Sequence, residues 1–155
     1  MNKPIIDKLT VGALEECDLP ELNITALNIR IDTGAKTSSL HVDNIVTEDR
    51  EGVEWVSFDI HPDIHNVERV VRRAAPVKQQ RTIKSSNAEK EQRKVIDTTI
   101  TMGGESWQIE VTLTDRSSMS YLMLLGREAM LTRILVDPSE EYLLGKRDES
   151  AVINE

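Results

Sequence analysis

An aspartate followed by Thr-Gly closes an alternating apolar segment, and its carboxylate is the group in this sequence best suited to catalysis. The tripeptide is Asp32-Thr33-Gly34. Gly34 allows the backbone angles of a sharp turn, and the Thr33 hydroxyl can hold that turn by hydrogen bonding. Two carboxylates placed side by side share one proton, so one can activate water while the other protonates a peptide carbonyl. The same tripeptide also makes a turn without function, and these residues alone leave both possibilities open.

A mechanism with paired carboxylates needs a second such motif, and the sequence contains one only. Asp97-Thr98 lacks the glycine, and the remaining aspartates have no Thr-Gly after them. The second carboxylate must then come from another copy of the chain, across a two-fold axis. We therefore predict a homodimer in which the two Asp32 carboxyl groups face each other.

Basic residues gather in one part of a chain that is acidic overall. The net charge of −8 and the aromatic content of 3% argue against nucleic-acid binding. Nine of the 19 lysines and arginines nevertheless fall within residues 69–94. This stretch is either a solvated loop or a segment that attracts an acidic polymer, such as an acidic peptide.

Two histidines four positions apart, His61 and His65 in HPDIH, are weak candidates for a metal site. A helix would place both on one face, but Pro62 disfavours a long helix here. The chain lacks the general-base glutamate of the zinc motif His-Glu-x-x-His, and it lacks the phosphate-binding motif Gly-x4-Gly-Lys-Ser/Thr. We expect neither zinc nor another cofactor. His41 is expected to be a strand residue rather than a catalytic base.

Cysteine usage and hydropathy indicate the compartment. Cys17 is the single cysteine, so no disulfide can form within the chain, which suits a reducing environment. Residues 1–22 contain no continuous apolar stretch and do not resemble a signal peptide. No run reaches the length of a membrane helix, about 18 apolar residues. We expect a cytoplasmic protein that does not enter the membrane.

The elements that must position these residues are predicted to be mostly strands. Asp32 follows ITALNIRI, whose alternation suits a half-buried strand. Gly103-Gly104 should form the turn of a hairpin, and Pro76 should make its own segment an edge or a projecting element. One short helix is expected in GREAMLTRI. Further strands are expected within residues 39–60, 67–85, 93–115, 120–125 and 135–145.

These elements predict one mainly β domain spanning residues 1–155, folded as a compact barrel or sandwich with one short helix. The polar ends, residues 1–8 and 146–155, are expected to be frayed.

The combination of motifs resembles a known family. IDTGA with a later LLGR is similar to the retroviral-type aspartic proteases. IDTGAKTSSLH, RTIKSSN, LTDRSSMSYLMLLGREAM and LVDP together resemble the bacterial family labelled ATP-dependent zinc protease, described as retropepsin-like. The resemblance implies a closed acid-protease-like barrel and an aspartic peptidase. It also implies a link to an ATP-grasp ligase, because some family members are associated with one that adds glutamates to a ribosomal protein.

The resemblance assigns roles to particular residues. Asp32 matches the catalytic aspartate, and Thr33 and Gly34 match its supporting loop. Structural support is implied for three further residues: Ala35, Gly126 and Arg127. Residues 77–94 match the flap that closes over substrate, and its basic residues would contact the peptide, which is expected to be glutamate-rich. The flap residues expected to bind substrate are Arg81, Lys84 and Arg93.

The chain also departs from the retroviral pattern. After Asp-Thr-Gly-Ala the retroviral enzymes carry an acid that pairs with the arginine of Gly-Arg, whereas this chain has Lys36. Arg127 must therefore find another partner. These departures favour a second hypothesis, a non-catalytic module that binds an acidic peptide or a glutamate ligase partner. A third hypothesis, a metal-dependent hydrolase, rests on the family label and on His61 and His65.

Overall fold

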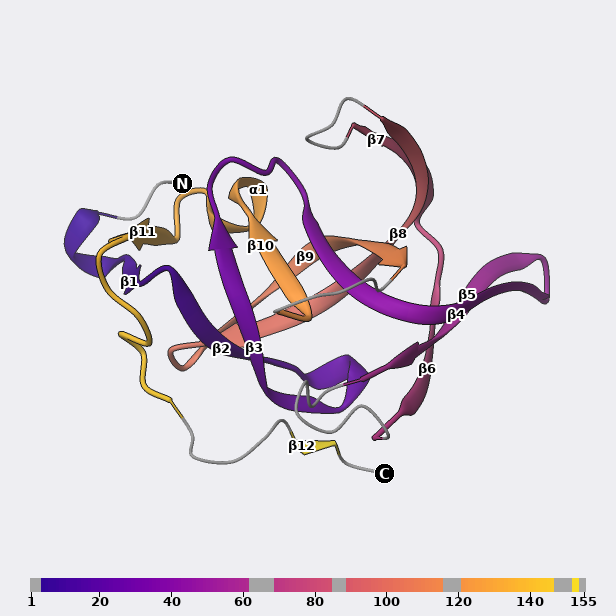
Figure 1. The fold of residues 1–155 in the computed structure, drawn as a ribbon, viewed down its shortest axis with the longest axis horizontal. Coiled ribbons are helices and arrows are strands. Elements are labelled where there is room, and N and C mark those ends of the chain that lie inside the picture. The colour runs from indigo at the N-terminus through magenta and orange to yellow at the C-terminus, as the bar shows by residue number, and fades with distance from the viewer. Residues whose placement is uncertain (1–3, 62–68, 85–88, 116–120, 147–151, 154–155) are drawn as a thin grey trace.

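The chain is folded mainly into strands, as the sequence predicts. The computed structural model describes residues 4–61, 69–84, 89–115, 121–146 and 152–153. Among these residues the single α-helix is short, and two 3-10 turns precede strands near the N-terminus (Figure 1). In chain order the elements are η1 (Ile5–Asp7), β1 (Leu9–Val11), β2 (Leu14–Leu19), η2 (Pro20–Leu22), β3 (Ile24–Asp32), β4 (Ser38–Arg50), β5 (Val53–Ile60), β6 (Val71–Pro76), β7 (Gln79–Lys84), β8 (Lys90–Met102), β9 (Glu105–Asp115), β10 (Met123–Gly126), α1 (Arg127–Met130), β11 (Ile134–Val136) and β12 (Val152–Ile153).

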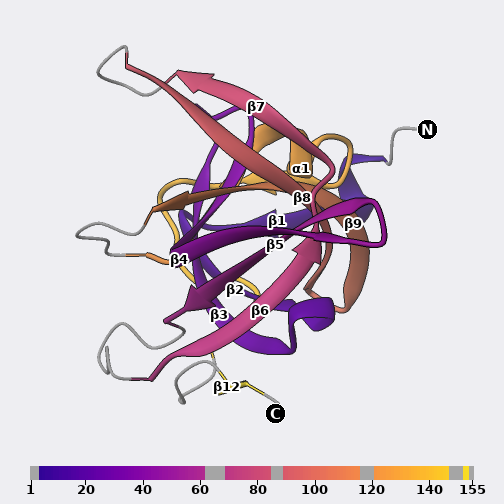
Figure 2. The same cartoon turned by 90° about the vertical axis from the view of Figure 1, so that its right-hand side faces the viewer.

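Strand pairing links β3, β2, β8, β9, β4 and β10 in a ring. β10 closes it, because it pairs in parallel with β3 on one side and antiparallel with β4 on the other. Strand β5 pairs with β4, and β6 pairs with β5 at the end of the strand order, which is the first of the two positions expected from Pro76, an edge or a projecting element. The N-terminal part of β8 pairs with β7, and together they form an arm that projects from the body of the molecule (Figures 1 and 2).

Alternating apolar residues fill the space inside the ring. In β9, the side chains of Trp107, Ile109, Val111 and Leu113 are buried, each separated from the next by one residue. Aliphatic side chains form most of this core, with Phe58 as its only buried phenylalanine. The core is therefore built largely from Val, Ile and Leu, as the low aromatic content indicates.

The turn between β8 and β9 is a two-residue hairpin, as predicted. Met102 pairs with Glu105, which leaves Gly103 and Gly104 as the connecting residues. Both glycines have positive φ, 57° and 81°, the backbone region that a tight hairpin turn requires and that side chains disfavour.

The predicted helix differs in extent from the structure. The helix expected over 126–134 is confirmed only as α1, because Leu131 has non-helical backbone angles, φ −54° and ψ 132°, and the chain then turns into β11. Near the two chain ends the structure describes the short elements η1 and β12, and β12 pairs with β3. The polar tip of the predicted flap, residues 85–88, lies outside the described residues.

Candidate active site

Asp32 is the last residue of β3 and opens a tight turn. The backbone N–H of Gly34 donates to Asp32 Oδ1 at 3.0 Å, and the N–H of Ala35 donates to the Asp32 carbonyl at 3.2 Å. A side chain at position 34 would bring its Cβ to 3.3 Å from Asp32 Oδ1, so glycine leaves this carboxylate the most room. The turn therefore fixes the carboxylate by local bonds.

Gly126 lies opposite Asp32 because β10 and β3 run in parallel register. Its N–H donates to Ser38 Oγ at 3.0 Å, which ties the end of β10 to the start of β4. A Cβ at position 126 would lie 2.6 Å from the Thr37 carbonyl carbon and 2.8 Å from its oxygen. Only glycine allows this close backbone approach.

Arg127 holds the aspartate loop through its carbonyl groups. Its Nη1 lies 3.4 Å from the Thr33 oxygen and 3.2 Å from the Gly34 oxygen, and its backbone N–H donates to the Ala35 oxygen at 2.8 Å. The sequence showed that this arginine needs a partner other than the usual acid, and the loop carbonyls fill that role.

The lysine that replaces the expected acid has a partner of its own. Lys36 Nζ lies 3.7 Å from Oε1 of Glu128, the second residue of α1. Both side chains are exposed, at 70% and 45%, so this pair adds little to stability. In the retroviral arrangement the loop carries the acid of the ion pair, whereas here the loop carries the base, Lys36, and α1 carries the acid, Glu128. The loop still contacts α1.

A groove of about 1090 Å³ runs past Asp32. Five basic and two acidic side chains line it, so its charge is positive in a chain of net charge −8. The charged residues lining it are Asp32, Lys36, Arg81, Lys84, Arg93, Arg127 and Glu128. Gly34, Ala35 and Thr37 line it from the aspartate loop, and Ser39, Thr112 and Leu124 line it from the sheet.

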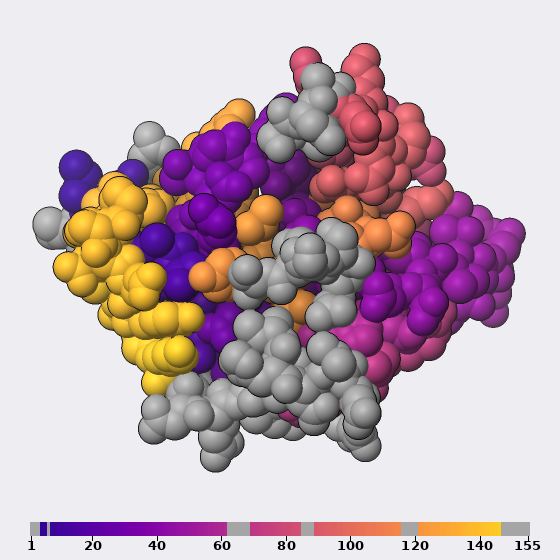
Figure 3. All heavy atoms as spheres, viewed as in Figure 1, coloured from indigo at the N-terminus to yellow at the C-terminus, as the bar shows by residue number. Residues whose placement is uncertain are grey.

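The groove brings the predicted flap together with the aspartate loop. Arg81 and Lys84 come from β7 and Arg93 from β8, the two strands of the projecting arm. In the space-filling view the arm and the loop after β3 stand on the same side of the molecule (Figure 3). All three predicted flap residues therefore lie on one groove with Asp32.

Glu110 anchors the base of the arm. Its carboxylate lies 2.8 Å from Lys78 Nζ and 3.0 Å from Arg81 Nη2. The hydrogen bond from Lys78, then that from Arg81, lowers the pKa of Glu110 below its ordinary value. Lys78 also contacts Asp97 at 3.2 Å, so charged pairs join β8, β9 and the arm.

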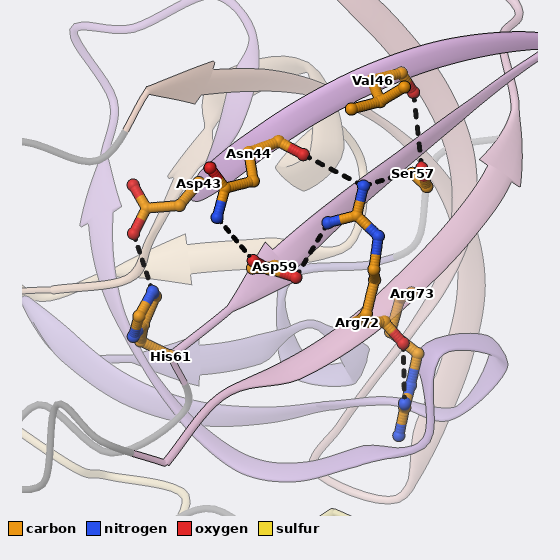
Figure 4. A network of polar contacts seen from close by, with 8 residues as sticks. All are labelled: Asp43, Asn44, Val46, Ser57, Asp59, His61, Arg72 and Arg73. Atoms are coloured by element: carbon orange, nitrogen blue, oxygen red, sulfur yellow. Dashed lines mark hydrogen bonds and ion pairs between the residues drawn. The ribbon is translucent and has the colours of Figure 1, made fainter.

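Of the two weak histidine candidates for a metal site, the structure describes His61. His61 Nε2 lies 2.7 Å from Asp43 Oδ2, at the edge of a polar network that joins β4, β5 and β6 (Figure 4). His65 lies outside the described residues, and within those residues no group of three or more His, Cys, Asp or Glu is placed to hold a metal.

The centre of that network is Asp59. It accepts from Asn44 at 2.7 Å and pairs with Arg72 at 2.9 Å (Figure 4). The Asn44 hydrogen bond is the largest cause of a lowered pKa for the Asp59 carboxyl group. These bonds cross three strands, so the network stabilises the β4–β5–β6 extension and lies apart from the groove residues.

Ser39 and Thr112 were not predicted from the sequence as groove residues. They pair with each other across β4 and β9 on the face opposite Leu40 and Leu113. The sequence signal was present, because a polar side chain alternates with a core side chain in both strands. The pairing that brings the two strands together is long-range and could not be obtained from either strand alone.

The described residues include no helix long and apolar enough to cross a membrane.

Comparison with known proteins identifies the family. The model of the retropepsin-like aspartic endopeptidase RimB family matches residues 10–147. The chain belongs to this RimB-like family. The resemblance to retropepsin-like proteins drawn from IDTGA and LLGR is thereby confirmed.

Curated relatives of this RimB-like chain carry another name. Proteins of Shewanella pealeana and Desulfotalea psychrophila, both named "Probable alpha-L-glutamate ligase", are 47% and 46% identical over 146 residues, 94% of this chain. The match covers 32% and 31% of those proteins, so the chain spans about a third of the relatives it matches.

A solved structure supports the fold of this RimB-like chain. The crystal structure of Lpg0085 from Legionella pneumophila, described as a protein of unknown function, matches with a TM-score of 0.73 and 26% identity. The match covers 88% of this chain and 98% of the Legionella chain.

Proposed function

We propose that this chain is an aspartic peptidase that cleaves glutamate-rich peptides with a carboxylate pair made from Asp32 of two subunits. The observation that carries the proposal is the position of Asp32, fixed by its own turn on a groove with an excess of basic side chains. The RimB-like family, described as aspartic endopeptidases, supports the class of chemistry.

The chemistry follows from two carboxyl groups that share a proton. The ionised Asp32 removes a proton from a water molecule, and the water oxygen attacks the peptide carbonyl carbon. The protonated Asp32 of the other subunit donates to the carbonyl oxygen, and proton return to the amide nitrogen releases the products. The enzyme forms no covalent intermediate, and both carboxylates must be present.

The acidic substrate class rests on charge and on the relatives. Carboxylate side chains of a peptide complement the groove, which contains arginines able to bind them in a bidentate manner. In the curated relatives a region similar to this chain is part of a longer protein named for glutamate ligation. A peptidase for glutamyl chains would reverse the bond formation that such a name describes.

Mass spectrometry of α-linked octaglutamate incubated with the purified chain tests the proposal. We expect shorter glutamyl products from the parent chain and none from Asp32→Asn. Asp97→Asn is the matched control, because it makes the same change at the other Asp-Thr, outside the groove lining. Equal cleavage by the Asp32→Asn variant would refute the catalytic role.

Subunit mixing tests the shared pair. If each active site needs Asp32 from both subunits, an equal mixture of parent and Asp32→Asn chains, after exchange, retains about a quarter of the activity of the same total amount of parent chain. If each subunit acts independently, the mixture retains about half of the activity of the same total amount of parent chain. The mass of the assembly, measured by light scattering, shows whether dimers are present.

A second function is favoured by one observation, the ligase name of the relatives. In this alternative the groove binds a glutamyl peptide or a glutamate ligase partner and cleaves nothing. Binding of octaglutamate that weakens with salt and does not change in Asp32→Asn, together with no product, would favour it over the peptidase. Cleavage by the parent chain would exclude it.

A further inference from the structure

The sheet wall of the groove continues past its described lining into a buried polar patch. Ser39 and His41 lie on the same face of β4, opposite the core residues Leu40 and Val42, because side chains alternate along a strand. Ser39 lines the groove, and His41 lies one side-chain repeat further along. His41 pairs with Thr114 of β9, as Ser39 pairs with Thr112.

His41 is a buried side chain with unused hydrogen-bonding capacity. It is 9% exposed, and neither Nδ1 nor Nε2 has a hydrogen-bond partner in the described part of the chain. Burial, and then the positive charge of Arg93, lowers the pKa of His41 to about 4, so the imidazole is neutral at pH 7. A neutral imidazole retains one N–H donor, and leaving it unpaired in a protein interior is costly.

Arg93 contributes a second unused donor at the same end of the groove. It lines the groove, its side chain is 15% exposed, and its Nη2 lies 3.1 Å from Glu91 Oε2. Its Nε is buried and has no hydrogen-bond partner within the described residues.

His41 pairs with Thr114 of β9, and Val95 of β8 pairs with Thr112. Arg93, two residues before Val95, therefore lies on the same face of the sheet as His41. β4 and β8 flank β9, so one acceptor above β9 could approach both side chains. A carboxylate has the two oxygens and the negative charge that suit these donors.

Strand register gives the separation between this patch and Asp32 along the strand direction. Gly126 is level with Asp32, and the backbone N–H of His41 donates to the carbonyl of Leu122 at 2.9 Å. His41 therefore lies four positions along the β10 direction from the level of Asp32, roughly 13 Å at the rise of a strand. An extended peptide covers this distance with about four residues.

We propose that Arg93 and His41 form a subsite that binds a substrate carboxylate about four residues from the bond held at Asp32. The inference rests on the proposed function and deepens it, because it selects long acidic peptides over short ones. The carboxylate comes either from a glutamyl side chain or from the C-terminus of the peptide.

Peptide binding to the Asp32→Asn chain tests this subsite without cleavage. Fluorescence anisotropy would compare labelled triglutamate with labelled octaglutamate on three further variants in that background: Arg93→Gln, His41→Gln and Lys94→Gln. Lys94 is the matched control, since it is the next residue of β8, pairs with Glu54 at 3.2 Å and does not line the groove. Circular dichroism checks folding, and Arg93→Gln is sufficient if His41→Gln fails to fold.

We expect Arg93→Gln and His41→Gln to weaken octaglutamate binding about 10-fold or more and to change triglutamate binding less than about twofold. Lys94→Gln should change both less than about twofold. The subsite is refuted if Arg93→Gln and Lys94→Gln weaken octaglutamate equally, since that result shows general charge attraction. It is also refuted if the loss with Arg93→Gln is the same for both peptide lengths.

Two further arms identify the carboxylate and separate this inference from the proposed function. Loss of the Arg93→Gln effect with a C-terminal amide assigns the C-terminal carboxylate, and its persistence assigns a side chain. A peptide in which every glutamate is replaced by glutamine and the C-terminus is an amide has no carboxylate, so with this peptide the effect of Arg93→Gln must disappear. Cleavage by the parent chain with no length-dependent effect of Arg93→Gln refutes the subsite alone. Length-dependent binding without cleavage supports the subsite and refutes the peptidase.

Discussion

The buried His41 should make the fold sensitive to mild acid. The imidazole prefers its neutral form in the folded chain, where its pKa is about 4, against the ordinary value of 6.5 that the unfolded chain retains. Between these two values the unfolded chain binds a proton that the folded chain does not. The free energy of unfolding therefore falls as the pH falls through this window.

The size of the effect follows from the two pKa values. At pH 7 the His41 contribution is close to its full value, and at pH 5 the linkage relation gives a loss of about 2 kcal/mol. At pH 4 the loss reaches about 3 kcal/mol. Asp59 and Glu110 have lowered pKa values, so their contributions are lost mainly below their ordinary values of 3.8 and 4.5. Above pH 5 their effect is small beside that of His41.

Urea unfolding at pH 7, 6 and 5 measures this slope, with His41→Gln as the perturbation. The glutamine does not titrate, so the variant should keep about the same free energy of unfolding over this range while the parent loses about 2 kcal/mol. His61→Gln controls for the substitution itself, because it makes the same change at a histidine that bonds to Asp43 away from the groove. Equal slopes for the parent and His41→Gln would refute the assignment.

Other predictions concern contacts around the site and its supports. Gly126→Ala should lower the free energy of unfolding by about 1 to 3 kcal/mol in urea, because its Cβ would meet the Thr37 backbone at 2.6 Å; no change would contradict the close approach. Glu15→Gln should cost about 1 to 3 kcal/mol by the same assay, because the fully buried carboxylate accepts N–H bonds from Gly12, Leu143 and Leu144. Lys36→Gln should lower the free energy of unfolding, measured by thermal denaturation, by less than about 1 kcal/mol, because its ion pair with Glu128 is exposed. A larger loss would show that this ion pair fixes the loop.

Local features of the structure were predictable because neighbouring residues determine them. Alternation predicted β3, and Gly103-Gly104 predicted the turn of the β8–β9 hairpin. Pro76 predicted an edge or a projecting element, and β6 lies at an edge of the described sheet. The end of α1 was not predictable in this way, because the chain leaves the helix at Leu131 and continues into β11, which pairs with the distant strand β1.

Some features of the candidate site were likewise predictable from local sequence, and others depended on the tertiary structure. The sequence by itself determined the Asp32 turn, the Gly126-Arg127 pair and the basic character of β7 and β8, since each depends on residue type and local spacing. Only the tertiary structure decided that Arg127 bonds to the loop carbonyls, that Lys36 pairs with Glu128, and that Ser39 and Thr112 face the groove. These contacts join strands distant in the chain, and their register is set by packing of the shared core, which no single segment contains.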